Sequence, residues 1–390
     1  MLYWIYTLWK DAQAQGADWA ETFSFFRLLG YITLRAGLAA TIAFSLSLFL
    51  GGRVIRKLIS LKVGQPIRTA EEVHKLAELH GGKAGTPTMG GIMILGTVFL
   101  AVLLCADMTN PFVLVTLVVT LALGILGFLD DYKKIVEKSS DGVSGKLKLV
   151  WQGVVGLGAA LFLCYNPQTS EYLFYSGGEV TEPTTVKVTS VSFPLLTFVI
   201  PLGLLAIPFF MALLVGTSNA VNLTDGLDGL ATGVTVTVAM AYAIICYLSG
   251  TKPAAEYLNI FFNPHLAELS ILMMALVGAG LGFLWFNCHP AKVFMGDTGS
   301  LAIGGAIGMT AICAKQELLL VIIGGVFVME AMSVILQVGS FKLRGKRILA
   351  MSPIHHHFEL RGWHENQVII RFWVLSILLS LFGIALLKVI

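Results

Sequence analysis

Long apolar runs alternate with short polar segments along almost the whole chain. A helix needs about 20 mainly apolar residues to cross the hydrocarbon core of a bilayer. Runs of this kind predict ten membrane-spanning helices, at residues 30–50, 88–106, 111–129, 147–165, 195–215, 230–249, 267–287, 299–314, 318–339 and 369–388. The eighth run is short and rich in glycine, which favours close packing between helices. The pattern predicts an all-α, multi-pass membrane protein that forms a single domain over residues 1–390.

Basic residues are concentrated in one of the two sets of connecting segments. Ten spans would put both termini on one side and the loops 51–87, 130–146, 216–229, 288–298 and 340–368 on the other. These loops hold 17 Lys and Arg residues, against 6 in the opposite segments and tails. Because cytoplasmic loops carry the excess of Lys and Arg, we expect these loops in the cytoplasm and both termini in the periplasm. The opposite segment 166–194 predicts a small periplasmic β-hairpin with Gly177 and Gly178 at its turn.

Composition agrees with a membrane protein and excludes several other classes. Of the 390 residues, 56% are hydrophobic and only 13% are charged, which is too few charges for a soluble surface of this size. The net charge of +3 argues against a nucleic-acid-binding protein that depends on phosphate contacts. The five cysteines are scattered, so neither a disulfide framework nor a zinc site is expected. The first 29 residues lack the pattern of a signal peptide.

Acidic residues stand at the ends of predicted spans on the cytoplasmic side. Asp130 and Asp131 follow the third span, Asp225 and Asp228 lie between the fifth and sixth, and Asp297 precedes the eighth. Carboxylates at the membrane boundary are costly unless they are paired, solvated or bound to a cation. A solvated helix end with local ion pairs would explain the Asp130-Asp131 pair alone, but not the recurrence of the pattern.

Asparagine and aspartate recur every three residues in one of these loops, at Asn219, Asn222, Asp225 and Asp228. In helical or 3₁₀ geometry this spacing would place them on one face. Oxygen ligands with no His or Cys nearby suit a hard cation such as Mg²⁺ rather than Zn²⁺. An Asx turn without a metal is the alternative.

The motif MGDTGS places Asp297 at the start of the eighth span. Thr298 and Ser300 could cap that helix, and its first amides could hold an anion. Asp297 is then either an N-terminal cap or a cation ligand. The polar residues Asn287, His289 and Lys292 just before it favour the cation.

Two further loops offer groups to phosphate. The motif SPIHHHFE contains His355, His356 and His357, whose side chains diverge and so cannot all bind one metal; one or two would donate to phosphate oxygens when protonated. Lys83 and the backbone around Thr86, in KAGTPTMGG, could also bind phosphate, although a plain helix entry explains that segment equally well. Cation ligands, phosphate-binding groups and a membrane together predict transfer of a phosphate-bearing group between a soluble and a lipid molecule.

The motifs GTPTMGG, DDYKK, NLTDGLDGLA, FMGDTGS and SPIHHHFE resemble the phospho-N-acetylmuramoyl-pentapeptide transferase family, within the polyprenyl-phosphate N-acetylhexosamine-1-phosphate transferase superfamily. The resemblance implies that UDP-N-acetylmuramoyl-pentapeptide gives its phospho-sugar to undecaprenyl phosphate in the bacterial cytoplasmic membrane. The products would be lipid I and UMP, and Mg²⁺ would be required. A transferase of N-acetylglucosamine-1-phosphate is the nearest alternative. A cation-coupled transporter is a more distant one, because it predicts acids near the bilayer midplane.

The resemblance also implies roles for individual residues. Asp297 would bind Mg²⁺ with Asp131 beside it, Asp130 would deprotonate the lipid phosphate, and His355 and His356 would act at the sugar-phosphate end. The implied substrate-binding residues are Lys83, Thr86, Lys134, Lys146, Asn219, Asn222, Asp225, Asp228, Asn287, Phe294 and His357, with Asp228 at the uracil.

The order of bond formation and the oligomeric state are left open by the sequence. A single displacement by the lipid phosphate is favoured, because that phosphate is already largely ionised near neutral pH. A double displacement through an aspartyl adduct is the alternative. A homodimer is compatible with the sequence. The ninth span is expected to bend at Gly324 and Gly325 and to leave a groove for the prenyl chain.

Overall fold

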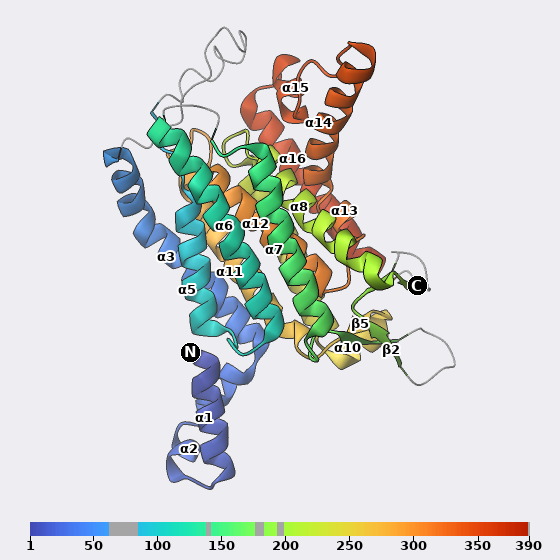
Figure 1. Ribbon diagram of the computed structural model, residues 1–390. Coiled ribbons are helices and arrows are strands. Elements are labelled where there is room, and N and C mark those ends of the chain that lie inside the picture. Colours follow the sequence, from blue (N-terminus) through green and yellow to red (C-terminus); the bar gives the residue numbers. More distant parts are fainter. Residues whose placement is uncertain (62–84, 138–141, 176–182, 193–198, 389–390) are drawn as a thin grey trace.

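The computed structural model describes residues 1–61, 85–137, 142–175, 183–192 and 199–388, and its long helices run side by side in one bundle (Figure 1). Within these residues, eight helices are long and apolar enough to cross a membrane. They are α3 (Ile32–Ser60), α6 (Pro111–Glu137), α7 (Gly145–Tyr165), α8 (Ala206–Thr224), α9 (Leu230–Ser249), α11 (Leu269–Asn287), α14 (Gly325–Arg344) and α16 (Glu365–Ala385). A mainly helical, multi-pass protein is thereby confirmed.

The two other predicted spans are also helices, but they are shorter or less apolar. Helix α5 (Gly91–Cys105) has 15 residues, and α12 (Gly296–Cys313) has 18 and begins with Asp297 in its first turn. Every residue of α12 from Thr298 to Cys313 is buried. The glycines of this helix allow that: a Cβ on Gly304 would lie 2.6 Å from the Cα of Ser218 in α8. The predicted close packing of the eighth span is confirmed, and α12 is the centre of the bundle.

Several helices extend beyond the apolar runs that predicted them. Helix α6 continues through Asp130 and Asp131 to Glu137, and α8 continues through Asn222 to Thr224. The predicted loops 130–146 and 216–229 were therefore wrong at their starts. The physical reason is that an apolar run marks the depth of the hydrocarbon core, whereas a helix can continue into water with polar side chains.

The ninth predicted span is interrupted where a bend was expected. Helix α13 (Leu320–Ile323) stops before Gly324, and α14 starts at Gly325. The remaining short helices are α1 (Leu2–Ala14), α2 (Asp18–Thr22), α10 (Lys252–Leu258) and α15 (Ile354–Leu360), with 3₁₀ turns at Ser24–Gly30, Gly203–Leu205, Leu266–Glu268 and Leu386–Lys388. Helix α15 lies at one end of the bundle, and α1, α2 and α10 lie toward the other (Figure 1).

Short strands lie at the end of the bundle opposite α15 (Figure 1). Strand β1 (Glu171–Phe174) pairs antiparallel with both β2 (Thr184–Lys187) and β5 (Phe261–Phe262), and β3 (Ser190–Ser192) pairs antiparallel with β4 (Val199–Pro201). The antiparallel pair β1–β2 agrees with the hairpin expected in 166–194. Its expected turn at Gly177 and Gly178 lies outside the described residues.

Candidate active site

Three carboxylates from two helices meet at the end of the bundle that carries α15. Asp130 and Asp131 lie near the end of α6, Asp297 lies in the first turn of α12, and oxygens of all three are within 4.8 Å of one another. Gly127, one turn before Asp131, permits this approach, because a Cβ there would lie 2.1 Å from the carbonyl oxygen of Asp297. The structure therefore brings together the three aspartates that the sequence singled out.

Asp131 caps the N-terminus of α12. Its Oδ1 accepts a hydrogen bond from the backbone N–H of Asp297 (3.2 Å), and its Oδ2 accepts from the N–H (2.9 Å) and the hydroxyl (2.7 Å) of Thr298. The anion expected at this helix end is thus the side chain of Asp131. Thr298 and Ser300 were expected to cap the helix; instead, Thr298 donates to Asp131 and the Ser300 hydroxyl donates to the carbonyl of Gly296.

Two lysines balance the charge of Asp130 and Asp297. Lys134 Nζ lies 2.6 Å from Asp130 Oδ2 and 3.4 Å from Asp297 Oδ2. Lys148 Nζ lies 2.9 Å from Asp130 Oδ1 and 2.8 Å from Asp297 Oδ2. Lys134 was predicted from the sequence, but Lys148 was not.

The predicted lysine Lys146 is exposed, whereas Lys148 points into the bundle. Residues two apart on a helix are about 200° apart around its axis, so both cannot face the same side. The buried Gln152, four residues after Lys148, marks the inward face of α7 and is the signal that would have identified Lys148.

Asn219, Asn222, Asp225 and Asp228 had been expected to share one face, but they do not. Asn219 Nδ2 donates to Gln152 Oε1 (2.9 Å), whereas Asn222 Nδ2 donates to Asp297 Oδ1 (2.9 Å). Helix α8 ends at Thr224, so the next two aspartates follow a different backbone path. Only Asn222 and Asp225 turn toward the carboxylate cluster.

Asp225 lies directly beyond the end of α8 and accepts a hydrogen bond from the backbone N–H of Gly296. Burial, and then the nearby carboxylates of Asp297 and Asp131, raise the pKa of Asp225 well above its usual range. This crowding of negative charge is what a bound cation relieves.

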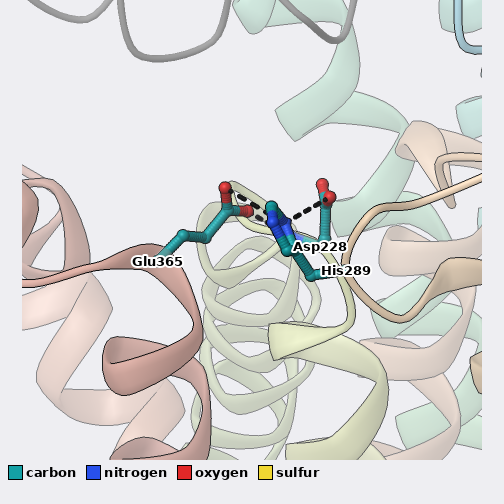
Figure 2. A group of neighbouring side chains, drawn as sticks. All are labelled: Asp228, His289 and Glu365. Carbon is teal, nitrogen blue, oxygen red and sulfur yellow. Dashed lines mark hydrogen bonds and ion pairs between the residues drawn. The ribbon is translucent and has the colours of Figure 1, made fainter.

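Asp228 belongs to a second cluster, with His289 and Glu365 (Figure 2). Its Oδ2 accepts a hydrogen bond from the N–H of Ala291 (3.0 Å) and lies 3.1 Å from His289 Nδ1. Glu365 Oε2 lies 3.5 Å from the same ring nitrogen. His289 had been expected to support a cation at Asp297, but it lies beside Asp228 instead, and Glu365 had been given no role.

The three consecutive histidines point to three different partners. His355 Nδ1 lies 3.1 Å from Glu330 Oε2, His356 Nδ1 lies 2.8 Å from Glu359 Oε2, and His357 Nδ1 accepts a hydrogen bond from the N–H of Ala350 (3.0 Å). Their predicted divergence is confirmed. Glu330 was missed, although a lone carboxylate within a predicted span is the signal that could have found it.

Residues 113–315 match glycosyl transferase family 4, and residues 83–95 match phospho-N-acetylmuramoyl-pentapeptide-transferase signature 1. A phospho-N-acetylmuramoyl-pentapeptide-transferase of Methylacidiphilum infernorum is 50% identical over 359 residues, which are 92% of this chain and 94% of that protein. The chain belongs to the phospho-N-acetylmuramoyl-pentapeptide-transferase family. The family 4 match contains the carboxylate cluster, since Asp130, Asp131 and Asp297 lie within 113–315.

The remaining predicted residues of this transferase differ in how they relate to the cluster. Lys83 lies outside the described residues, and Thr86 is half-buried. The N–H of Phe294 donates to the carbonyl of Pro87 (2.8 Å), which joins the signature segment to the loop before α12. Asn287 is buried, accepts a hydrogen bond from the Thr232 hydroxyl and donates to the carbonyl of Val293. Asn287 thus holds this loop.

The carboxylate cluster fits Mg²⁺ by the chemistry of its donors. Asp130, Asp131 and Asp297 offer only oxygen, the ligand atom that Mg²⁺ prefers. Asp225 adds a fourth carboxylate near them, and its pKa is raised first by burial and then by the charges of Asp297 and Asp131. Among the described residues no Cys or His joins this group, so its donor set does not favour Zn²⁺.

Proposed function

We propose that this chain transfers phospho-N-acetylmuramoyl-pentapeptide from UDP-N-acetylmuramoyl-pentapeptide to undecaprenyl phosphate, which gives lipid I and UMP. The observation that carries the proposal is the cluster of Asp130, Asp131 and Asp297 with Lys134 and Lys148 at one end of a membrane bundle, in a chain of this family. A soluble nucleotide can approach such an end from water, while a lipid phosphate reaches it from the bilayer.

The charged groups of the cluster divide the work of phosphoryl transfer. Bound Mg²⁺ would neutralise charge on the diphosphate, and Asp131 and Asp297 are the residues that would hold it. Lys134 and Lys148 each contact two carboxylates. When substrate binds, each ammonium group can give up one of these contacts and bind a phosphate oxygen instead. The side-chain amide of Asn222 donates to Oδ1 of Asp297 and holds this carboxylate in place. His355, held by Glu330, and His356 would contact the sugar-phosphate end.

A single displacement agrees best with the surroundings of Asp130. Its carboxylate is in contact with Lys134, Lys148 and the N–H of Val143 (2.7 Å), which crowd its oxygens and hinder their attack on a phosphorus atom. The lipid phosphate, whose second pKa is about 6, is mostly ionised near neutral pH. Asp130 then accepts the remaining proton and positions the two lysines.

The proposed topology has ten spans, both termini in the periplasm and the carboxylate cluster at the cytoplasmic face of the bacterial inner membrane. It is supported by the basic loops, which flank the end of the bundle that holds the aspartates. The strands β1 and β2 would form the periplasmic hairpin. The broken helix α13–α14 would border the groove for the prenyl chain.

The test is UMP release by the purified protein in detergent, with both substrates and with either Mg²⁺ or EDTA. We expect release that needs both substrates, stops with EDTA and is lost in Asp297→Ala. UDP-N-acetylglucosamine is supplied in a parallel reaction, and we expect it to be a poor donor. Equal use of both donors would indicate the sister transferase, and release that is indifferent to EDTA and to the mutation would contradict the metal site.

A further inference from the structure

The second cluster fixes the carboxylate of Asp228 from two directions. Asp228 is 2% exposed, and its Oδ2 meets the N–H of Ala291 at 3.0 Å and His289 Nδ1 at 3.1 Å. A carboxylate on each side of Nδ1 means that this nitrogen carries a proton and donates, since an ionised carboxylate can only accept. His289 therefore holds Asp228 in one orientation.

Glu365 closes the network from another part of the chain. Its Oε2 lies 3.5 Å from His289 Nδ1, and its Oε1 accepts the backbone N–H of Asp228 at 3.1 Å. Glu365 is the first residue of α16, and the indole N–H of Trp373 in that helix donates to the carbonyl of Gly229 (3.3 Å). Figure 2 shows the ring of His289 between the two carboxylates. The loop α8–α9, the loop α11–α12 and the start of α16 are thus joined at this point.

We propose that His289, together with Glu365, is a positioning residue that aims Asp228 at the base of the nucleotide. The inference rests on the proposed function and on the role that the family resemblance implies for Asp228, a contact to the uracil. Uracil presents an N3–H donor between two carbonyl oxygens, and a fixed carboxylate accepts from that donor. Cytosine has an unprotonated N3 at the same place, which a carboxylate repels. A firmly held Asp228 therefore selects uridine over cytidine nucleotides.

The position of this network predicts which kinetic constant it controls. His289 and Glu365 belong to a different cluster from Lys134, Lys148 and the three aspartates. A contact to the base is made equally in the ground state and the transition state. Its loss raises KM for the nucleotide substrate and leaves kcat unchanged.

The first experiment measures UMP release at saturating polyprenyl phosphate, together with binding of UMP and CMP by calorimetry. We expect His289→Ala to raise KM for the nucleotide substrate and Kd for UMP by about tenfold, with kcat within about twofold of wild type. His289→Asn, whose amide N–H replaces the Nδ1 donor, should recover most of the affinity. The control Cys288→Ala changes the exposed neighbouring residue and should behave as wild type. The ratio of the Kd for CMP to the Kd for UMP should be smaller in His289→Ala than in wild type.

A double-mutant cycle shows whether His289 acts through Asp228. In an Asp228→Ala background, His289→Ala should add no further loss of UMP affinity. Three results would overturn the inference: additive losses of UMP affinity, a lower kcat at unchanged KM in His289→Ala, or a His289→Asn variant that melts like wild type but recovers no affinity. Each of these applies when the wild-type protein releases UMP. Absence of UMP release by wild type would instead overturn the proposed function.

Discussion

Two lysines two residues apart in α7 have different environments, and only one reaches the carboxylates. Lys148 Nζ contacts Asp130 and Asp297, whereas Lys146 is exposed. We expect Lys148→Met to lower kcat for UMP release by roughly 10²–10³, because a charged donor beside the transferring phosphoryl group is lost. Lys146→Met is the matched control and should keep nearly full activity. Equal losses in the two variants would contradict the assignment.

The ring of His355 is held by a glutamate from within a predicted span. Glu330 Oε2 lies 3.1 Å from His355 Nδ1, while the buried Nε2 has no hydrogen-bond partner among the described residues. That nitrogen points toward the loop before α9, since a Cβ on Gly226 would lie 2.3 Å from it. A buried nitrogen without a hydrogen-bond partner, such as Nε2 of His355, is typical of a group that binds a ligand.

Removal of the Glu330 charge should therefore weaken catalysis in steps. We expect Glu330→Gln to lower kcat by about tenfold, because the amide still occupies the site but no longer fixes the tautomer of His355. Glu330→Ala should lower it further, and His355→Gln furthest. Lys342→Ala, an exposed change in the same helix, serves as the control in the same UMP-release assay. Full activity of Glu330→Ala would exclude the positioning role.

The residue types of the site were readable from the sequence, but their geometry was only partly so. Asp131 was expected beside Asp297 at the metal, and the structure groups both with Asp130, because α6 and the start of α12 pack against each other through Gly127. Lys148 and Glu330 were missed, since their roles depend on the rotation of α7 and α14 about their axes. That rotation is set by packing, which a run of apolar letters does not report.

The start of α12 is held by a side chain from another helix rather than by its own residues. Asp131 accepts two backbone N–H groups and one hydroxyl there. We expect Asp131→Ala to lower the free energy of unfolding by roughly 2 kcal/mol or more, because buried donors lose their acceptor. Asp297→Ala should cost much less stability while it abolishes Mg²⁺-dependent UMP release. Thermal melting of both variants in detergent separates the structural role of Asp131 from the metal-binding role of Asp297. Equal melting temperatures would contradict the proposal that Asp131 stabilises the start of α12.

The crossing of α5 and α12 depends on backbone contact that only glycine allows. A Cβ on Gly91 would lie 2.2 Å from the backbone nitrogen of Gly299, while a Cβ on Gly96 in the same helix would meet nothing within 4 Å. We expect Gly91→Ala to destabilise the protein by about 1–3 kcal/mol, because the helices must separate. Gly96→Ala should leave the melting temperature unchanged or slightly higher. Equal melting temperatures for the two variants would mean that the α5–α12 crossing accepts a methyl group at residue 91, against this prediction.

Across the whole molecule, the order of the long helices was predictable, but their exact number and their arrangement were not. Hydropathy located every helix of the bundle because lipid demands apolar runs. It did not indicate that Asp228 would separate from Asp225 and join His289 and Glu365. This arrangement arises from contacts between segments far apart in sequence, such as the hydrogen bond from the N–H of Asp228 to Glu365.

The proposed orientation in the membrane is testable through two positions at opposite ends of the bundle. Cys288 is exposed in the loop between α11 and α12, beside the His289 cluster, and Thr184 is exposed in β2. A nucleotide donor made in the cytoplasm requires the first end to face inward, which agrees with the basic loops there. We expect a membrane-impermeant maleimide to label Thr184→Cys, in a Cys288→Ala background, in right-side-out vesicles.

Cys288 of the wild-type protein should react with the same reagent only in inverted or permeabilised vesicles. The cysteines Cys105, Cys246 and Cys313 are buried and should contribute little background. Three long helices, α8, α9 and α11, separate the two positions in the chain, so labelling of both from one side would contradict the proposed topology. The reversed pattern would place the carboxylate cluster outside the cell, where UDP-linked donors are absent, and the transferase reaction could not proceed in that orientation.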